Sequence, residues 1–434
     1  MRNIYLLFLC LLLLVPSIFA QGIPESYFYA DENVVTGGLG MTWIDGQPYT
    51  TFTFAPEIAV GKIGVGLYLQ LLMDNNNEFK LRKDEYQGGA GILRAINYIR
   101  YGRKYDPVYT RIGSLEMASL ANGFLMWNYN NASNYDKRKI GLALDIDFGK
   151  FGFESVTNNL GFLEVIGANL YFRPVRFANS NVPILRNFRI YGTYVYDNDV
   201  FSLTKPGQKK VLRAYGLGAD LLFIDTPIFK SGVYYDYGKF KDFGSGQGVG
   251  INALFPEFVG LFALSAKFEK RFINDEFIPD FFGPLYELQR SLEPEKYFGE
   301  SSIFALKNAK KNEGYFGQLA GHIIHKVSLV GSYQRLNDVK GSGIVHLEAL
   351  APDLVPKFEL RAFYDKIGIE TFKDFRTLDN RSVLTAEVGY RLNMFLVLST
   401  VYRWYWVRNV KEDGTVEYKP VERIEPRISV SFKF

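Results

Sequence analysis

Apolar and polar side chains alternate along most of this chain. At the C-terminal end, 424–434, the even positions carry apolar residues and the odd positions carry polar ones, from Glu425 to Lys433. An alternation of period two places the two sets on opposite faces of an extended strand. The same pattern recurs in stretches of about ten residues, the length of a tilted membrane strand, at 62–73, 139–148, 358–365 and 382–392. A helical period would scatter the charged residues around a cylinder, so the pattern predicts an all-β protein.

The first twenty residues are typical of a secretory signal peptide. Arg2 precedes an apolar run from Ile4 to Val15, and the small residue Ala20 stands before Gln21. This run is shorter than the ~20 residues that a spanning helix needs, which argues against an uncleaved anchor. Cleavage would remove Cys10, the chain's single cysteine, so the mature protein would have no disulfide and no thiolate for catalysis or metal binding.

Composition favours a membrane barrel over a soluble β-sandwich. The mean hydropathy is −0.05, although the chain contains 29 Tyr and 37 Phe. Low average hydropathy with many aromatics suits a wall in which alternate residues face lipid and aromatic girdles mark the interfaces. The formal charge of +4 falls to +3 without Arg2, and no basic run accompanies it, so nucleic acid is not an expected partner.

The C-terminal stretch also resembles the closing strand of bacterial outer-membrane β-barrels, which ends in an aromatic residue preceded by alternating apolar residues. The resemblance implies a porin-like antiparallel transmembrane β-barrel in the outer membrane of a diderm bacterium, embedded in its lipid. A count of the alternating stretches and the turns between them gives about 18–20 strands, a number within the known range of such barrels. It identifies no closer family. It also implies that the barrel-assembly machinery reads a signal formed by Ile428, Val430, Phe432 and Phe434. The predicted organisation is a signal peptide at 1–20, a short periplasmic segment at 21–33 and the barrel at 34–434.

A barrel of this size has a lumen too wide to fill with wall side chains alone. The alternation predicts charged residues that face inward and line the pore; the candidates are Asp145, Asp147, Arg189, Glu359, Arg361, Glu387, Arg391 and Arg427. The alternative is that these side chains simply pair across strands. Neither sign dominates, so the set does not predict anion or cation selectivity.

Two stretches do not fit a simple succession of wall strands. If 107–116 and 123–131 both crossed the wall, the strand at 62–73 would be inverted, so only one of them can cross. We expect 111–131 to form either a hairpin or a constriction in the lumen, and a constriction would present Asn122, Asn128 and Asn130. The long stretch 273–313, rich in aromatics, is expected to fold into or over the pore mouth, or else to remain a solvated outer loop.

The function expected from these features is passive diffusion of small hydrophilic solutes through an outer-membrane channel, with no chemical step, no metal and no other cofactor. One alternative is a channel for hydrophobic compounds with a lateral opening. Another is a barrel that serves as an enzyme or adhesin scaffold, for which His322, His325 and His346 would be the first residues to test. The solute and the oligomeric state, including whether the chain forms a homo-oligomer, are left open.

Overall fold

The computed structural model describes residues 34–44, 47–73, 79–81, 95–132, 139–178, 182, 184–200, 211–258, 261–290, 306–324, 326–351, 354–379, 381–410 and 416–433. The predicted signal peptide, the predicted periplasmic segment 21–33, His325 and Phe434 lie outside these residues. Among the described residues, no helix combines the length and the apolar character needed to cross a bilayer.

One antiparallel sheet of 22 strands makes up almost the whole fold. The strands of its first half are β1 (Val34–Ile44), β2 (Gln47–Val60), β3 (Ile63–Leu67), β4 (Leu69–Met73), β5 (Phe79–Leu81), β6 (Ile96–Tyr101), β7 (Val108–Gly113), β8 (Gly141–Asp147), β9 (Phe151–Thr157), β10 (Val165–Phe172) and β11 (Phe188–Asp197). Those of its second half are β12 (Leu212–Asp225), β13 (Lys230–Phe240), β14 (Ser245–Phe258), β15 (Phe262–Ile273), β16 (Asn312–Ile323), β17 (Val327–Leu336), β18 (Gly343–Ala351), β19 (Phe358–Ile369), β20 (Ser382–Arg391), β21 (Leu396–Val410) and β22 (Val416–Lys433).

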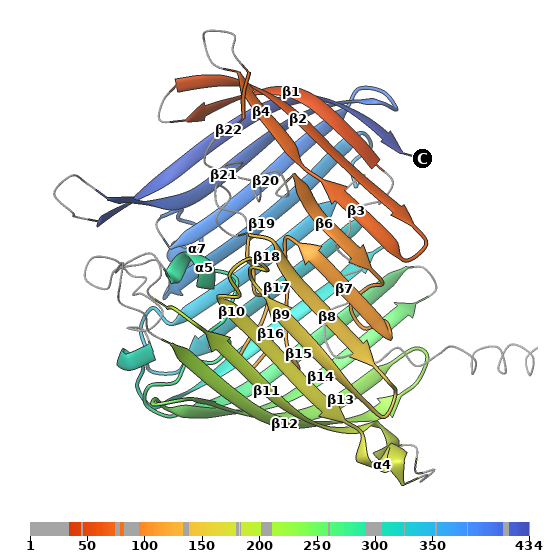
Figure 1. The fold of residues 1–434 in the computed structure, drawn as a ribbon, viewed down its shortest axis with the longest axis vertical. Helices are drawn as coiled ribbons and strands as arrows, with labels where there is room; N and C mark the ends of the chain where they lie inside the picture. The colour runs from red at the N-terminus through yellow and green to blue at the C-terminus, as the bar shows by residue number, and fades with distance from the viewer. Residues whose placement is uncertain are drawn as a thin grey trace, which may run out of the picture.

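The sheet closes into a barrel because β1 pairs with β22, starting at Val34 opposite Lys433 (Figure 1). Strands β3 and β4 both pair with β2 on either side of Tyr68, and their other edges pair with β6 and β5. Strands β3 and β4 therefore share one position in the wall, and β5 and β6 share the next one. Counted in this way, the 22 described strands form a barrel of 20 wall strands. This confirms the predicted barrel and its approximate size.

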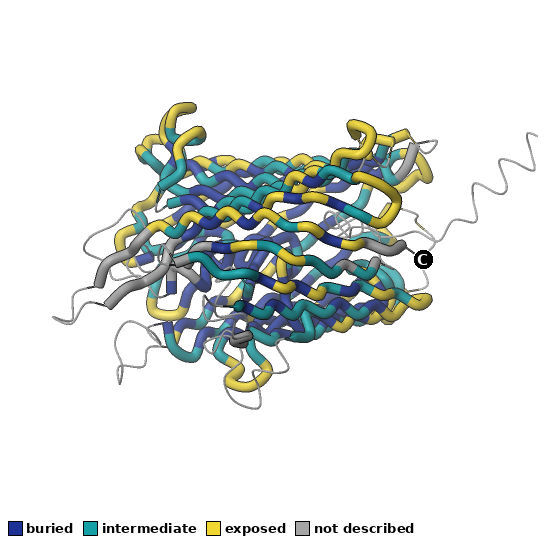
Figure 2. The backbone as a smooth tube through the Cα atoms, turned by 90° about the horizontal axis from the view of Figure 1, so that it is seen from above, coloured by how far each residue is buried: buried dark blue, intermediate teal, exposed yellow. Residues whose placement is uncertain are grey.

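Exposed and buried positions alternate along the wall strands (Figure 2). In β22, Ile424 and Ile428 are 47% and 56% exposed on the outer face, whereas Glu425 and Ser429 are buried on the inner face. Outward apolar side chains meet lipid, and closure of the sheet pairs the backbone groups that hydrocarbon could not hydrogen-bond. The closing strand therefore turns its apolar face outward, as its sequence predicts.

Consecutive strands run in opposite directions, so connections alternate between the two ends of the barrel. We call the end that holds Lys433 the turn rim and the opposite end the loop rim. The turn rim carries short connections such as 61–62 and 392–395, together with one longer connection that contains α4 (Pro174–Phe177) and the 3-10 helix η3 (Leu185–Asn187). The longer connections 198–211, 274–311 and 370–381 start and end at the loop rim, and their described parts contain α5 (Tyr286–Gln289) and α7 (Phe372–Phe375).

The parity problem in the sequence has a clear structural origin. Strand β7 crosses the wall, but residues 114–132 form no wall strand and make only isolated bridges, one between Ala118 and Tyr129 and one between Met126 and Phe282. The second bridge joins this segment to the long connection 274–311. Residues 114–132 and 274–290 together are called the plug below.

Candidate functional site

The plug builds a hydrophobic core inside the barrel. Its buried apolar residues come from both plug segments and from the inner faces of the surrounding strands; in the plug they are Leu115, Ala118, Leu120, Phe124, Leu125, Met126, Tyr129, Phe277, Phe281, Phe282 and Tyr286. Phe124 stacks on Phe277 with ring centroids 5.6 Å apart. Burial of this many aromatic side chains is a large favourable free energy. One side of the lumen is therefore packed like a protein interior.

Glycines on the inner face of the wall make room for this core. A Cβ added to Gly238 on β13 would lie 2.9 Å from Leu125 Cδ2 and 2.9 Å from Phe277 Cζ. One added to Gly167 on β10 would lie 2.6 Å from Leu120 Cδ1. Real Cβ atoms do not approach other heavy atoms so closely, so larger residues here would push the plug away from the wall.

Backbone hydrogen bonds hold the two plug segments to each other. The Asp280 N–H donates to the Phe124 carbonyl at 2.7 Å, and the Phe282 N–H donates to the Leu125 carbonyl at 3.2 Å. Within the first segment, the Gly123 N–H donates to the Leu120 carbonyl and closes a turn, which we call the plug's tip. Gly123 has a φ of +88°, which suits glycine. The two segments thus form one unit, although about 150 residues separate them in the sequence.

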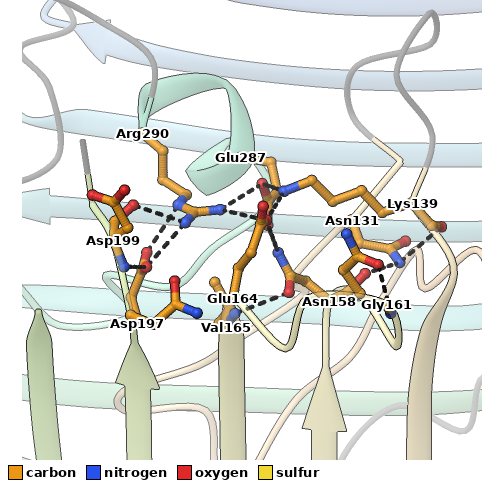
Figure 3. A network of polar contacts seen from close by, with 12 residues as sticks. Asn131, Lys139, Asn158, Gly161, Glu164, Val165, Asp197, Asp199, Glu287 and Arg290 are labelled. Atoms are coloured by element: carbon orange, nitrogen blue, oxygen red, sulfur yellow. Dashed lines mark hydrogen bonds and ion pairs between the residues drawn. The ribbon is translucent and has the colours of Figure 1, made fainter. Parts of the chain in front are cut away.

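A buried charge network ties the plug to the loop rim (Figure 3). Glu287 on α5 accepts hydrogen bonds from Lys139 Nζ at 2.8 Å and from Asn158 Nδ2 at 2.8 Å, and it contacts the Tyr129 hydroxyl. Burial alone would raise the pKa of Glu287, but Lys139 and Arg290 lower it to about 2. Its carboxylate is therefore charged at neutral pH and held by two cations.

Arg290 extends this network to the neighbouring strand ends. Its guanidinium pairs with Asp197 at the end of β11 at 2.9 Å and with Glu164 at 3.2 Å, and it donates to the Asp199 carbonyl at 3.0 Å. Because the side chain of Arg290 is 2% exposed, loss of a partner would leave a buried charge unpaired. The network therefore fixes where α5 sits on the rim.

A second set of charged side chains holds the plug against β15. Arg271 on β15 pairs with Asp280 at 2.7 Å and with Glu269 at 2.5 Å. Lys267 on the same strand donates to the Asn122 carbonyl. Burial, as the largest cause, raises the pKa of Asp280 to about 6. These contacts anchor the plug to β15 near the middle of the barrel.

On the other side of the plug, a cavity of about 310 Å³ lies between the plug and the wall. We call it the passage. Its walls come from the plug and from β2, β6–β9 and β18–β21, and its charged lining residues are Glu57, Lys104, Arg111, Glu116, Glu348, Arg361 and Arg403. Tyr98, Tyr109, Phe363, Trp404 and Tyr405 add aromatic faces. Both signs of charge and several aromatic rings therefore meet in one polar slot.

The candidate pore-lining residues have different surroundings. Arg361 is exposed and lies in the wall of the passage. Asp145 and Arg189 face inward but are buried, Asp145 against Lys104 at 2.6 Å and Arg189 against Asp220 at 2.6 Å. The plug covers this side of the wall, which is why such inward charges end in ion pairs.

The remaining candidates also pair with opposite charges or face inward. Asp147 pairs with Arg173 at 2.9 Å close to the turn rim. Glu359 pairs with Arg391, and Arg427 pairs with Glu425 at 2.5 Å. Glu387 is half-buried on the inner face of β20. Pairing across or along strands, the alternative weighed from the sequence, accounts for much of this set.

The three candidate constriction asparagines are buried in the plug. Asn122 Nδ2 donates to the Tyr191 hydroxyl at 2.7 Å, and Asn130 Oδ1 accepts from the Ala132 N–H at 2.8 Å. Asn128 Nδ2 has no hydrogen-bond partner among the described residues and borders a small cavity of about 60 Å³ that Asn122 and Lys267 also line. Asn130 borders the passage.

His346 is enclosed by structural contacts. Its Nδ1 lies 2.8 Å from Asp365 Oδ1 and its Nε2 lies 3.1 Å from Glu348. Its ring packs edge-on against Trp127 of the plug and against Phe363. Among the described residues, no group of three or more His, Cys, Asp or Glu side chains is arranged to hold a metal ion.

Several residues of the site did not emerge from the sequence. Arg111 and Arg403 lie on inward positions of β7 and β21, so the alternation contained a signal for them. Lys104 and Glu116 lie outside the strands, where an alternation of period two does not predict which way a side chain faces. Glu287 contacts Tyr129, Lys139 and Asn158, which lie more than 120 residues earlier in the sequence, and no local pattern links them to α5.

A scan against protein-family models and a search of curated proteins give no match. Among solved structures, the chain is similar to OccK2 (OpdF) of Pseudomonas aeruginosa, determined in complex with glucuronate, with 11% identity, 92% of this chain and 94% of that chain covered, and a TM-score of 0.33. It is also similar to a BenF-like porin from Pseudomonas fluorescens Pf-5, with 10% identity, coverage of 92% and 96%, and a TM-score of 0.34. Likeness at this level does not identify a solute.

The chain's own architecture is more informative. Its wall is closed, antiparallel and 20 strands around. Apolar side chains face outward and ionic side chains face inward, which is the arrangement of barrels that cross an outer membrane. The protein is a closed β-barrel of the kind that crosses an outer membrane.

Proposed function

We propose that this barrel is a channel for the passive diffusion of small hydrophilic solutes. The observation that carries the proposal is the passage, a polar slot of about 310 Å³ beside the plug. Solutes would cross the membrane along this slot, and its width, charges and hydrogen-bonding groups would select among them. No chemical step, metal or other cofactor is needed.

Mixed charge in the passage favours polar solutes over apolar ones. Arg361 is exposed to the slot on one wall, and Glu116 on the plug is also exposed. A hydrated solute can exchange water for these groups, whereas an apolar solute would desolvate them without compensation. The plug narrows the route, so the channel would conduct far less than an unobstructed barrel of the same strand number.

The barrel-assembly machinery is the partner proposed for insertion, through the alternating apolar residues Ile428, Val430, Phe432 and Phe434. Ile428 and Val430 are 56% and 40% exposed on the outer face of β22. The loop rim would then face the outside and the turn rim the periplasm. A homo-oligomer is compatible with this function but is not required by it.

Single-channel recording in planar bilayers tests the channel. The refolded protein should give small, steady conductance steps. A variant in which 277–308 is replaced by a short glycine–serine linker should give larger steps, because half of the plug is gone. Heat-modifiable migration on gels would confirm that both proteins are folded barrels. Absence of ionic current from both folded proteins would refute the proposal.

A further inference from the structure

The seam between the first and last strands is closed along only part of its length. Strands β1 and β22 pair from Val34 opposite Lys433 as far as Gly40 opposite Arg427. Beyond that point β1 pairs with β2 up to Ile44, and β22 pairs with β21 back to Val416. Figure 1 shows the β1–β2 and β21–β22 hairpins pointing apart toward the loop rim. Among the described residues, the seam thus opens into a wedge between two strand edges.

Proline explains where the pairing stops. The next pair in the register would join Met41 to Pro426, and proline has no N–H to donate to the ladder. A side-chain contact replaces the backbone ladder at this point. Arg423 Nη2 and Nε donate to Thr42 Oγ1 at 3.2 and 3.3 Å. A flexible side chain therefore bridges the wedge where a rigid ladder would otherwise continue.

The wedge reaches into the lipid-facing part of the wall. Met41 and Ile424, on its two sides, are 42% and 47% exposed on the outer face. Strand edges cannot stand unpaired in hydrocarbon, because each lost backbone hydrogen bond costs several kcal/mol, but they are tolerated where they line a wet cavity. The wedge must therefore communicate with the aqueous lumen or hold a molecule that offers hydrogen bonds.

A cavity of about 610 Å³ lies at the closed end of the wedge, beside the last paired residues Gly40 and Arg427, and opens broadly to the outside of the barrel. Residues from both faces of the wall line it. Leu39, Leu398 and Ile428 bound it with outward apolar side chains. Ser399 and Arg427 belong to the inner face and bound it as well. The site therefore offers an apolar surface toward the membrane and hydrogen-bonding groups toward the lumen.

We propose that the wedge is a lateral portal for amphipathic molecules, which have a hydrogen-bonding head and an apolar tail. The head would bind near Arg427 and the strand edges, and the tail would lie against Leu398 and Ile428 in the outer leaflet. Such molecules would move between the leaflet and the lumen without crossing the loop rim. This route is distinct from the passage of hydrophilic solutes along the barrel axis.

An edge strand from a second copy of the chain would also satisfy the open edges. The structure favours the small amphipathic molecule for two reasons. Arg423 already spans the gap to Thr42, so an inserted strand would have to break this contact. The cavity is also bounded largely by apolar side chains on the membrane side, which suit a lipid-like tail.

The test closes the wedge and follows an amphipathic probe. The double variant Met41→Cys/Pro426→Cys would lock the wedge by a disulfide, and the single variant Pro426→Val would restore the missing N–H donor and extend the ladder. The matched control is Thr36→Cys/Ser431→Cys, a disulfide between positions that are already paired in the ladder and lie outside the cavity lining. The probe is NBD-labelled lysophosphatidylcholine in liposomes, and its transfer between leaflets is measured by extraction into serum albumin.

The wild-type protein and the control should accelerate probe transfer over protein-free liposomes, whereas both closed variants should lose that acceleration. Single-channel conductance should be the same in all four proteins, so a failure of the channel proposal would be seen separately. Unchanged transfer in the closed variants would overturn the portal. Disulfide-linked dimers formed in membranes by the single variant Met41→Cys would overturn it too, since a second copy would then occupy the wedge.

Discussion

A substitution at Gly238 offers a direct way to displace the plug from the wall. Replacement by valine places a Cβ 2.9 Å from both Leu125 and Phe277, and two further methyl groups deepen the clash. Overpacking of this kind costs about 1–3 kcal/mol. If this cost falls on the docked plug, the ratio of undocked to docked plug rises roughly 5- to 150-fold.

Single-channel recording measures this ratio as the fraction of time spent at high conductance. The control is Gly317→Val, because no atom of the part of the chain that the structure describes lies within 4 Å of a Cβ added to Gly317 on β16. If Gly238→Val does not fold, Phe277→Ala weakens the same packing without a clash. Identical traces from Gly238→Val, Phe277→Ala and the control would show that the plug does not limit the current.

Three further predictions concern charged groups. Glu287→Gln weakens a buried pairing with Lys139 and Arg290, so limited proteolysis of the long connection should speed up as expected for a loss of about 3 kcal/mol. The control Glu313→Gln removes an exposed pairing with Lys270 and should change stability by under ~1 kcal/mol. Acid should weaken the plug in the same way. The pKa of Glu287 is lowered from its ordinary value near 4.5 to about 2. The stabilisation that its carboxylate gives the docked plug is therefore complete above pH 4.5 and is lost as the pH falls through 2. Current noise should rise in that window, and Glu287→Gln should remove the pH dependence. Arg361→Glu should shift the reversal potential in a KCl gradient toward cation preference, and an unchanged potential would place Arg361 outside the conducting path.

Much of the wall could be predicted from the sequence because a lipid-facing sheet imposes period two on every strand. The alternating stretches 139–148 and 382–392 each contain a wall strand, β8 (Gly141–Asp147) and β20 (Ser382–Arg391). The alternation in β22 predicts its outward and inward faces correctly at Ile428 and Glu425. The parity break between 107 and 131 also located a segment that leaves the wall.

What fills the lumen could not be predicted in this way. Period two tells which face a side chain occupies, but not what packs against that face. Asp145 and Arg189 were therefore candidates for a wet lining, although they are buried in ion pairs. The inward glycines held the missing signal: Gly216 and Gly248 leave inner-face positions without side chains, and Leu125 and Phe124 of the plug occupy that space.

The placement of the plug also separates two tasks around the circumference. Strands β10–β15 carry the glycines and ions that seat the plug, while β18–β21 contribute much of the passage wall. A substitution at Arg403, for example, can alter which molecules enter the passage without changing how tightly the plug is bound to the wall. Selectivity and gating can therefore diverge independently among descendants of this barrel, and a designer could retune one while leaving the other untouched.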